Sequence, residues 1–148
     1  QYTKFMVVLH IPLNYSVQVI ENVFNLTHIR NSGVAFGLFA SQQSEYKALM
    51  FITISTIAIM AILVLFHQNP KEKKMVQMGL ILIFSGAIGN LIDRTLHGEV
   101  IDFVDFVIKG NHFPAFNVAD SCITIGVSLM VVDLFFGKPE NDSSTETV

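Results

Sequence analysis

Four acidic side chains stand between two strongly apolar segments, in the stretch from Gly98 to Ser121. They are Glu99, Asp102, Asp105 and Asp120. A charged side chain at the centre of a bilayer costs about 2.5 to 3.5 kcal/mol on insertion scales, so acids next to membrane spans usually face a polar cavity or a partner. We therefore ask what chemistry a group of carboxylates here would perform.

Asp102 and Asp120 are the leading pair. They lie 18 residues apart, and residues 109–111 and 113–114 between them favour a turn that folds one acid back against the other. Two carboxylates that share a site cannot both ionise cheaply, so one keeps a proton at a raised pKa while the other acts as a base. Such a pair can deprotonate a water for attack on an amide and then protonate the leaving nitrogen.

Spacing alone leaves other interpretations open. Asp120 in the first turn of a helix would be stabilised by the helix dipole without any function, and Asp102 could be a solvated loop residue. Asp105, three residues from Asp102, competes for the same role. Asp93 and Arg94 either anchor the end of their helix or take part in the site.

A metal site is not expected. His28, His97 and His112 could approach the acids, but no pair of them has the spacing of a zinc site. Asp133, near the far end of its span, is expected to pair or to reach the interface. Cys122, the only cysteine, reads as a small packing residue.

The composition is that of a membrane protein. Of 148 residues, 51% are hydrophobic and only 14% are charged, where a soluble domain carries about 25% charge. The net charge of -3 and the scattered basic residues exclude the positive surface that nucleic-acid binding needs.

Three uncharged or nearly uncharged runs have the length of a membrane span, about 20 residues. They cover residues 48–66, 75–92 and 118–136. The second run contains glycines that allow helices to pack closely. Residues 16–27 alternate apolar and polar side chains and predict a small sheet, and Asn31 to Gly33 predicts a turn.

The orientation follows from the lysines at 71, 73 and 74, which place their short loop in the cytoplasm. The acidic stretch and residues 1–44 are then extracytoplasmic, and the polar tail 137–148 is cytoplasmic and disordered. Residues 1–9 read as the end of a helix whose body precedes residue 1. We expect one integral-membrane domain over residues 1–148, truncated at its N-terminus, with four helices in the intact protein and three here.

The chain closely resembles bacterial lipoprotein signal peptidase, also called signal peptidase II, over nearly its whole length. The resemblance is carried by ordered blocks at family-like spacing: Gln1, Thr3 and Lys4; Asn31, Gly33, Ala35, Phe36 and Gly37; Gly89, Asn90, Asp93 and Arg94; Gly98, Val100, Asp102 and Phe103; and Phe113, Pro114, Phe116, Asn117, Ala119, Asp120 and Ser121.

The resemblance implies a four-helix aspartyl endopeptidase of the bacterial inner membrane with a small extracytoplasmic β-cradle and no cofactor. It would cut prolipoproteins on the amino side of a diacylglyceryl-modified cysteine. The catalytic pair would be Asp102 and Asp120, while Asp105 has no counterpart in the motif. Residues that would support the site or hold the substrate are Lys4, Asn31, Gly33, Asn90, Asp93, Arg94, Asn117 and Ala119.

Two other functions fit parts of the pattern. A small transporter could use acids as proton relays, but it would need them near the middle of the membrane. A metal-dependent lipid phosphotransferase could hold Mg²⁺ with clustered aspartates, and chelation would abolish its activity.

Overall fold

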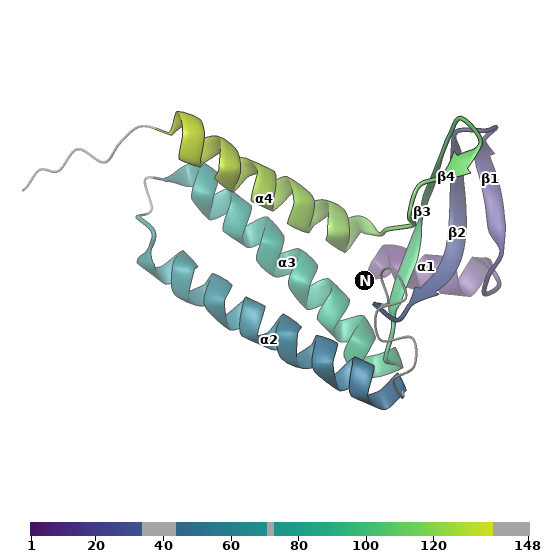
Figure 1. Cartoon of the computed structure of the whole chain (residues 1–148), viewed down its shortest axis with the longest axis horizontal. Coiled ribbons are helices and arrows are strands. Elements are labelled where there is room, and N and C mark those ends of the chain that lie inside the picture. Colours follow the sequence, from purple (N-terminus) through teal and green to yellow (C-terminus); the bar gives the residue numbers. More distant parts are fainter. Residues whose placement is uncertain (34–43, 71–72, 138–148) are drawn as a thin grey trace, which may run out of the picture.

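A computed structural model describes residues 1–33, 44–70 and 73–137. Three long helices lie side by side, and a small sheet and a short helix stand together at one end of them (Figure 1). The elements in chain order are α1 Tyr2–His10, β1 Ser16–Ile20, β2 Phe24–Asn31, α2 Ser44–Gln68, α3 Lys74–His97, β3 Val100–Ile108, β4 Asn111–His112 and α4 Val118–Phe136.

The three long helices confirm the predicted transmembrane bundle. All three are long and apolar enough to cross a membrane, and α4 has the predicted bounds. Helix α3 is longer than predicted, because it does not end at Ile92 but continues through Asp93 and Arg94 to His97. Gly98 then ends it in the left-handed conformation that glycine adopts without strain, with φ of 76°.

Helix α3 lies between α2 and α4 and contacts both (Figure 1). Its contact with α4 depends on small residues, since a side chain added at Gly79 would meet the carbonyl oxygen of Gly126 at 2.8 Å. One added at Gly86 would run into the carbonyl oxygen of Ala119. In lipid, such close backbone approach replaces the hydrophobic effect as the source of helix association.

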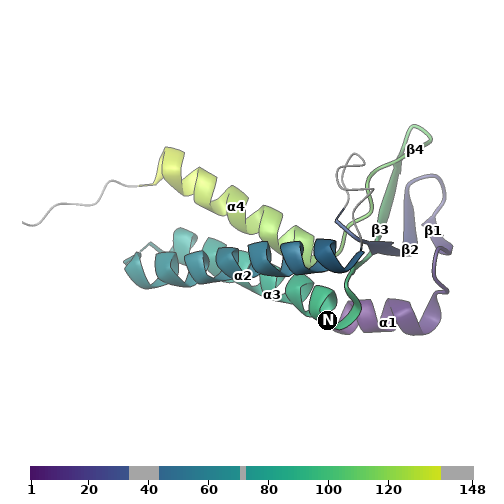
Figure 2. The ribbon, with the colours of Figure 1, turned by 60° about the horizontal axis from the view of Figure 1, so that its bottom comes forward.

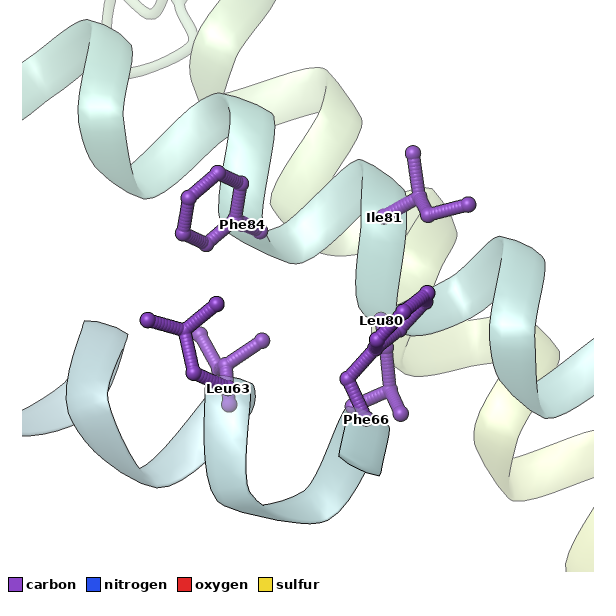
Figure 3. A pocket seen from close by; sticks show the side chains of 6 residues that line it. Leu63, Phe66, Leu80, Ile81 and Phe84 are labelled. Carbon is purple, nitrogen blue, oxygen red and sulfur yellow. The ribbon is translucent and has the colours of Figure 1, made fainter. Parts of the chain in front are cut away.

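The contact between α2 and α3 is built from larger apolar side chains. Ile62 of α2 packs with Val76 and Leu80 of α3. Beside them lies a cavity of about 220 Å³ whose lining is entirely apolar (Figure 3). It lies between these two helices and contains no group that could do chemistry.

The sheet is antiparallel, with strand order β1-β2-β3-β4. The strands predicted over residues 16–27 are therefore confirmed as β1 and β2, which are joined by a turn where Asn22 has φ of 56°. Lys109 and Gly110 also have positive φ and form the turn between β3 and β4.

The acidic stretch contains the nine-residue strand β3. Asp102 lies on this strand and is buried, so it is not the solvated loop residue that the sequence left possible. Asp102 and Asp105 are three residues apart, so they point to opposite faces of the strand. Both are buried. The sequence of the strand, VIDFVDFVI, therefore does not alternate between polar and apolar residues. Each carboxylate is covered by a different part of the fold.

Helix α1 lies against the sheet at the same end of the molecule (Figure 2). Val7 and Ile11 pack on Phe103 of β3 and form a small core. Lys4 lies on this helix and is only 3% exposed. A lysine so deeply buried requires an ionised partner.

Three of our expectations fall outside the described residues: the Ala35, Phe36 and Gly37 block, the lysine at 71 and the tail from residue 138 onward.

Candidate active site

Asp102 is placed by the central part of the sheet. It lies on β3, is 2% exposed, and stands opposite Ile29 of β2 in the strand register. Asn31, at the end of β2, donates from Nδ2 to Asp102 Oδ2 at 2.9 Å. The predicted turn follows at once, because the backbone N–H of Gly33 donates to Asn31 Oδ1 at 2.8 Å.

Asp120 is placed by the start of α4. Asn117 is the N-cap of this helix and its Oδ1 accepts from the backbone N–H groups of Ala119 and Asp120, at 2.7 and 3.2 Å. The Asp120 carboxylate in turn accepts from the backbone N–H of Asn117 at 3.0 Å. This reciprocal arrangement is a capping box, so the helix start fixes the Asp120 side chain.

The segment before α4 is fixed to β3. Val104 and Phe116 exchange two backbone hydrogen bonds, of 2.8 and 3.1 Å. Because Phe116 directly precedes Asn117, this pairing delivers the start of α4 to the strand that carries Asp102.

Asn117 connects the two aspartates. Its Nδ2 donates to Asp102 Oδ1 at 2.8 Å, and its backbone N–H donates to Asp120 Oδ2 at 3.0 Å. The residue is fully buried, with 0% exposure. One asparagine therefore holds both carboxylates, and the 17 residues between them fold back as the sequence predicted.

Helix α3 and helix α1 complete the network from the other side. Asn90 donates from Nδ2 to Asp120 Oδ1 at 2.7 Å and accepts from Lys4 Nζ at 2.9 Å. Lys4 also forms a buried ion pair with Asp93 at 2.6 Å. Asp93 is 1% exposed and accepts from the backbone N–H of Ile101 at 3.0 Å, which ties α3 to β3.

The charges around the pair oppose one another. Burial raises the pKa of Asp102 above its ordinary value, the amide donors of Asn31 and Asn117 act in the opposite direction, and the charge of Asp120 raises it further. The guanidinium of Arg94 lies close enough to Asp120 and Asp102 to interact with their charges. It lies 5.2 Å from the ring centre of Phe51 on α2.

Asp105 lies in a different environment. Its carboxylate accepts from Asn25 Nδ2 at 2.8 Å and contacts His112 Nδ1 at the same distance. His28 is buried in the sheet, with Nδ1 at 2.7 Å from the carbonyl oxygen of Ile11. Among the described residues no three His, Cys, Asp or Glu side chains gather as a metal site would require.

Two features of the site were missed from the sequence. Phe51 stands as an apolar residue inside a transmembrane run, so nothing marked it as the partner of Arg94. Phe51 is also one reason why residue 33 is a glycine, since a side chain there would collide with the Phe51 ring. A second reason is the positive φ of Gly33, +80°. The backbone N–H of Ile101 likewise has no sequence signal. Ala119 contributes its own N–H and lies against Gly86 and Gly89.

The fold and the site define a membrane protein with two hydrogen-bonded carboxylates where its helices meet a small sheet. The family model described as signal peptidase (SPase) II matches residues 1–136. A lipoprotein signal peptidase of Desulforapulum autotrophicum is 45% identical over 138 residues, which cover 93% of this chain and 85% of the relative. One from Syntrophus aciditrophicus is also 45% identical, over 140 residues that cover 95% of this chain and 87% of the relative.

A solved bacterial membrane enzyme has the same fold, with a TM-score of 0.81 at 36% identity, over 93% of this chain and 86% of its own. The chain belongs to the signal peptidase II family. It is therefore an aspartic-type peptidase that spans the membrane more than once, and the fold and family predicted from the sequence are confirmed.

Proposed function

We propose that Asp102 and Asp120 are the catalytic pair of this peptidase, and that Asn31, Asn90 and Asn117 hold their carboxylates in place. As a signal peptidase II, the chain is a membrane aspartyl protease that removes signal peptides from prolipoproteins. The observation that carries the assignment is the bridge through Asn117, which donates to both aspartates.

In the proposed reaction, Asp120 is the base and Asp102 carries the shared proton. Asp102 is the more buried of the two and its pKa is raised. Asp120 lies in the first turn of α4, where the helix dipole favours a negative charge. Like charges in one site cannot both ionise cheaply, so this division of roles suits both environments.

Asp120 takes a proton from water as the water oxygen attacks the carbonyl carbon of the scissile peptide bond, and Asp102 donates its proton to the carbonyl oxygen. The tetrahedral intermediate then collapses. The carbon–nitrogen bond breaks, the leaving nitrogen takes the proton held by Asp120, and a hydroxyl of the intermediate returns a proton to Asp102.

The substrate is proposed to be cut on the amino side of a diacylglyceryl-modified cysteine, at the extracytoplasmic surface of the inner membrane. Lys73 and Lys74 lie at the start of α3, at the end of the helices away from the sheet (Figure 1). The positive-inside rule assigns that end to the cytoplasm. The two aspartates are then extracytoplasmic, where a lipid-modified substrate that diffuses in the membrane offers its peptide bond.

A cleavage assay on a diacylglyceryl-modified prolipoprotein tests the assignment. Asp102→Asn and Asp120→Asn keep the size of the side chain but cannot exchange the proton, so each should abolish cleavage. Asp105→Asn is the matched control, because it lies on the same strand, is also buried and has other partners. It should retain most activity. An inactive Asp105→Asn beside an active Asp102→Asn would overturn the assignment.

A further inference from the structure

Asn31, Asn90 and Asn117 each accept a hydrogen bond at their side-chain oxygen from a group that can donate but cannot accept. Asn31 Oδ1 accepts from the backbone N–H of Gly33, and Asn117 Oδ1 accepts from the backbone N–H groups at the start of α4. A backbone N–H cannot become an acceptor. Both amides must therefore turn their NH₂ groups the other way, and in both cases the NH₂ group meets Asp102.

Asn90 follows the same pattern with a different kind of donor. Its Oδ1 accepts from Lys4 Nζ at 2.9 Å and, at the longer distance of 3.2 Å, from Asn117 Nδ2. Its Nδ2 donates to Asp120 Oδ1 at 2.7 Å. An ammonium group has three donors and no acceptor. A reversed amide would place two donors against each other at Lys4 and two acceptors against each other at Asp120.

Lys4 is itself held in a single position. It is 3% exposed, and its ion pair with Asp93 at 2.6 Å compensates for its burial. Asp93 is fixed by the backbone N–H of Ile101 at 3.0 Å. A chain of contacts thus runs from β3 through Asp93 and Lys4 to Asn90 and ends at Asp120.

We infer that Lys4 is a positioning residue for catalysis: as the nearer of the two donors to Asn90 Oδ1, beside Asn117 Nδ2, it directs the Asn90 amide so that its NH₂ group meets the ionised carboxylate of Asp120. The inference rests on the proposed function, in which the ionised Asp120 is the base, because it says which residues hold Asp120 in that role. It gives the buried ion pair a role beyond joining α1 to α3. Lys4 acts through Asn90 and has no hydrogen bond to either catalytic aspartate.

The charged groups around the pair come from three elements. Arg94 on α3 interacts with Asp120, Asp102 and Asp93, the charge of Lys4 on α1 acts on Asp102 and is paired with Asp93, and Asp102 on β3 and Asp120 act on each other. Loss of the donor from Asn90 removes a hydrogen bond that favours the charged form of the Asp120 carboxylate. Activity needs Asp120 ionised. The acid limb of the pH–rate profile should therefore move to higher pH when Lys4 no longer holds Asn90.

The first test is Lys4→Met, which keeps most of the length of the side chain and removes its charge and donors. In the full chain, kcat should fall by about 10- to 100-fold, the range expected for a lost hydrogen bond to a charged group. KM should stay unchanged and the acid limb should move upward. Lys4→Arg keeps a positive group that can only donate hydrogen bonds. It should restore part of kcat and return the acid limb of the pH–rate profile to its wild-type position. Lys109→Met, at an exposed turn, is the matched control.

The second test is Asn90→Asp, which remains informative if Lys4→Met fails to fold. An aspartate at this position keeps an oxygen for Lys4, so the fold should persist. It offers Asp120 an acceptor in place of a donor, and kcat should fall by at least about 100-fold. Near wild-type kcat in Asn90→Asp, or an unmoved acid limb in a folded Lys4→Met, would overturn the inference.

These outcomes are separable from those of the proposed function. If Asp102→Asn and Asp120→Asn abolish cleavage while Lys4→Met leaves kcat and the pH profile unchanged, only the role of Lys4 is wrong. If the aspartate variants remain active, the catalytic pair itself is wrong, whatever Lys4→Met does.

Discussion

At the scale of single residues, Asn117 has the largest number of roles at the site. Its side-chain oxygen caps α4, its side-chain nitrogen holds Asp102, and its backbone N–H holds Asp120. These roles belong to different atoms of one residue. Substitutions can therefore separate its contribution to stability from its contribution to catalysis.

Asn117→Asp should keep the helix cap, because aspartate caps helices as well as asparagine does. It replaces the donor to Asp102 with a second carboxylate in a fully buried position, so cleavage should be lost although the cap remains. Asn117→Ala should lose both cleavage and the cap, at a cost of about 0.5 to 2 kcal/mol. Full activity in Asn117→Asp would show that its amide is not needed by the pair.

The pH dependence also belongs to this scale. Cleavage requires Asp120 ionised and Asp102 protonated, so kcat/KM should fall on both sides of a maximum. Burial raises the pKa of Asp102, which places the alkaline limb above the ordinary aspartate value of about 3.9. The limbs belong to the coupled pair. A rate that rises to a plateau without an alkaline decrease would contradict the proton on Asp102.

At the scale of elements, the position of Asp120 depends on how closely α4 approaches α3. Gly86 and Gly89 lie one turn apart on α3 and face the start of α4. A Cβ at Gly86 would run into the backbone of Ala119, whereas one at Gly89 would meet only the Ala119 methyl at 3.3 Å. The two glycines therefore differ in how much the helices would have to move.

Gly86→Ala should push α4 away and move Asp120 relative to Asp102. Overpacking of this kind costs about 1 to 3 kcal/mol, so both the unfolding temperature in detergent and the cleavage rate should fall. Gly89→Ala is the matched control on the same helix and should change both much less. Equal effects of the two substitutions would argue against close packing at Gly86.

Helices and strands could be predicted from the sequence where their hydrophobic pattern is uninterrupted, and not where it is broken. Apolar runs revealed the three spans, and α4 was predicted with its observed bounds. Strand β3 was missed, because burial of Asp102 on one face and Asp105 on the other removes the alternation on which strand prediction depends. Without that strand, spacing could not decide between the two aspartates, and only the resemblance did.

At the scale of the whole molecule, the site forms where two parts of different character meet. The helices bring Asn90 and Asp120, the sheet brings Asn31 and Asp102, and α1 brings Lys4 (Figures 1 and 2). The contacts between them link residues up to 89 positions apart. Local sequence patterns contain no information about such pairings, so the Lys4 ion pair could not be predicted from spacing.

The orientation can be tested with reporters. One inserted at Asn69, beside Lys73 and Lys74, should lie in the cytoplasm, and one at Gly110 in the β3–β4 turn should be extracytoplasmic. Both positions lie between elements, so a reporter inserted there does not interrupt any of the apolar helices. Reporters on the same side of the membrane would contradict the proposed location of the site.

We expect no metal requirement, because an aspartate pair can activate water by itself. Cleavage in EDTA should equal cleavage without it, with a known metalloprotease as the positive control for chelation. Loss of activity that a divalent ion restores would instead favour metal-assisted hydrolysis.

The central claim is that Asp102 and Asp120 act as one unit that shares a proton. Single-turnover cleavage of a diacylglyceryl-modified prolipoprotein by Asp102→Asn, Asp120→Asn and the double variant tests it most directly. Residues that act as a unit are not additive, so the double variant should retain the same residual rate as either single variant. Effects that multiply in the double variant, or a single variant that retains the wild-type rate, would contradict the claim.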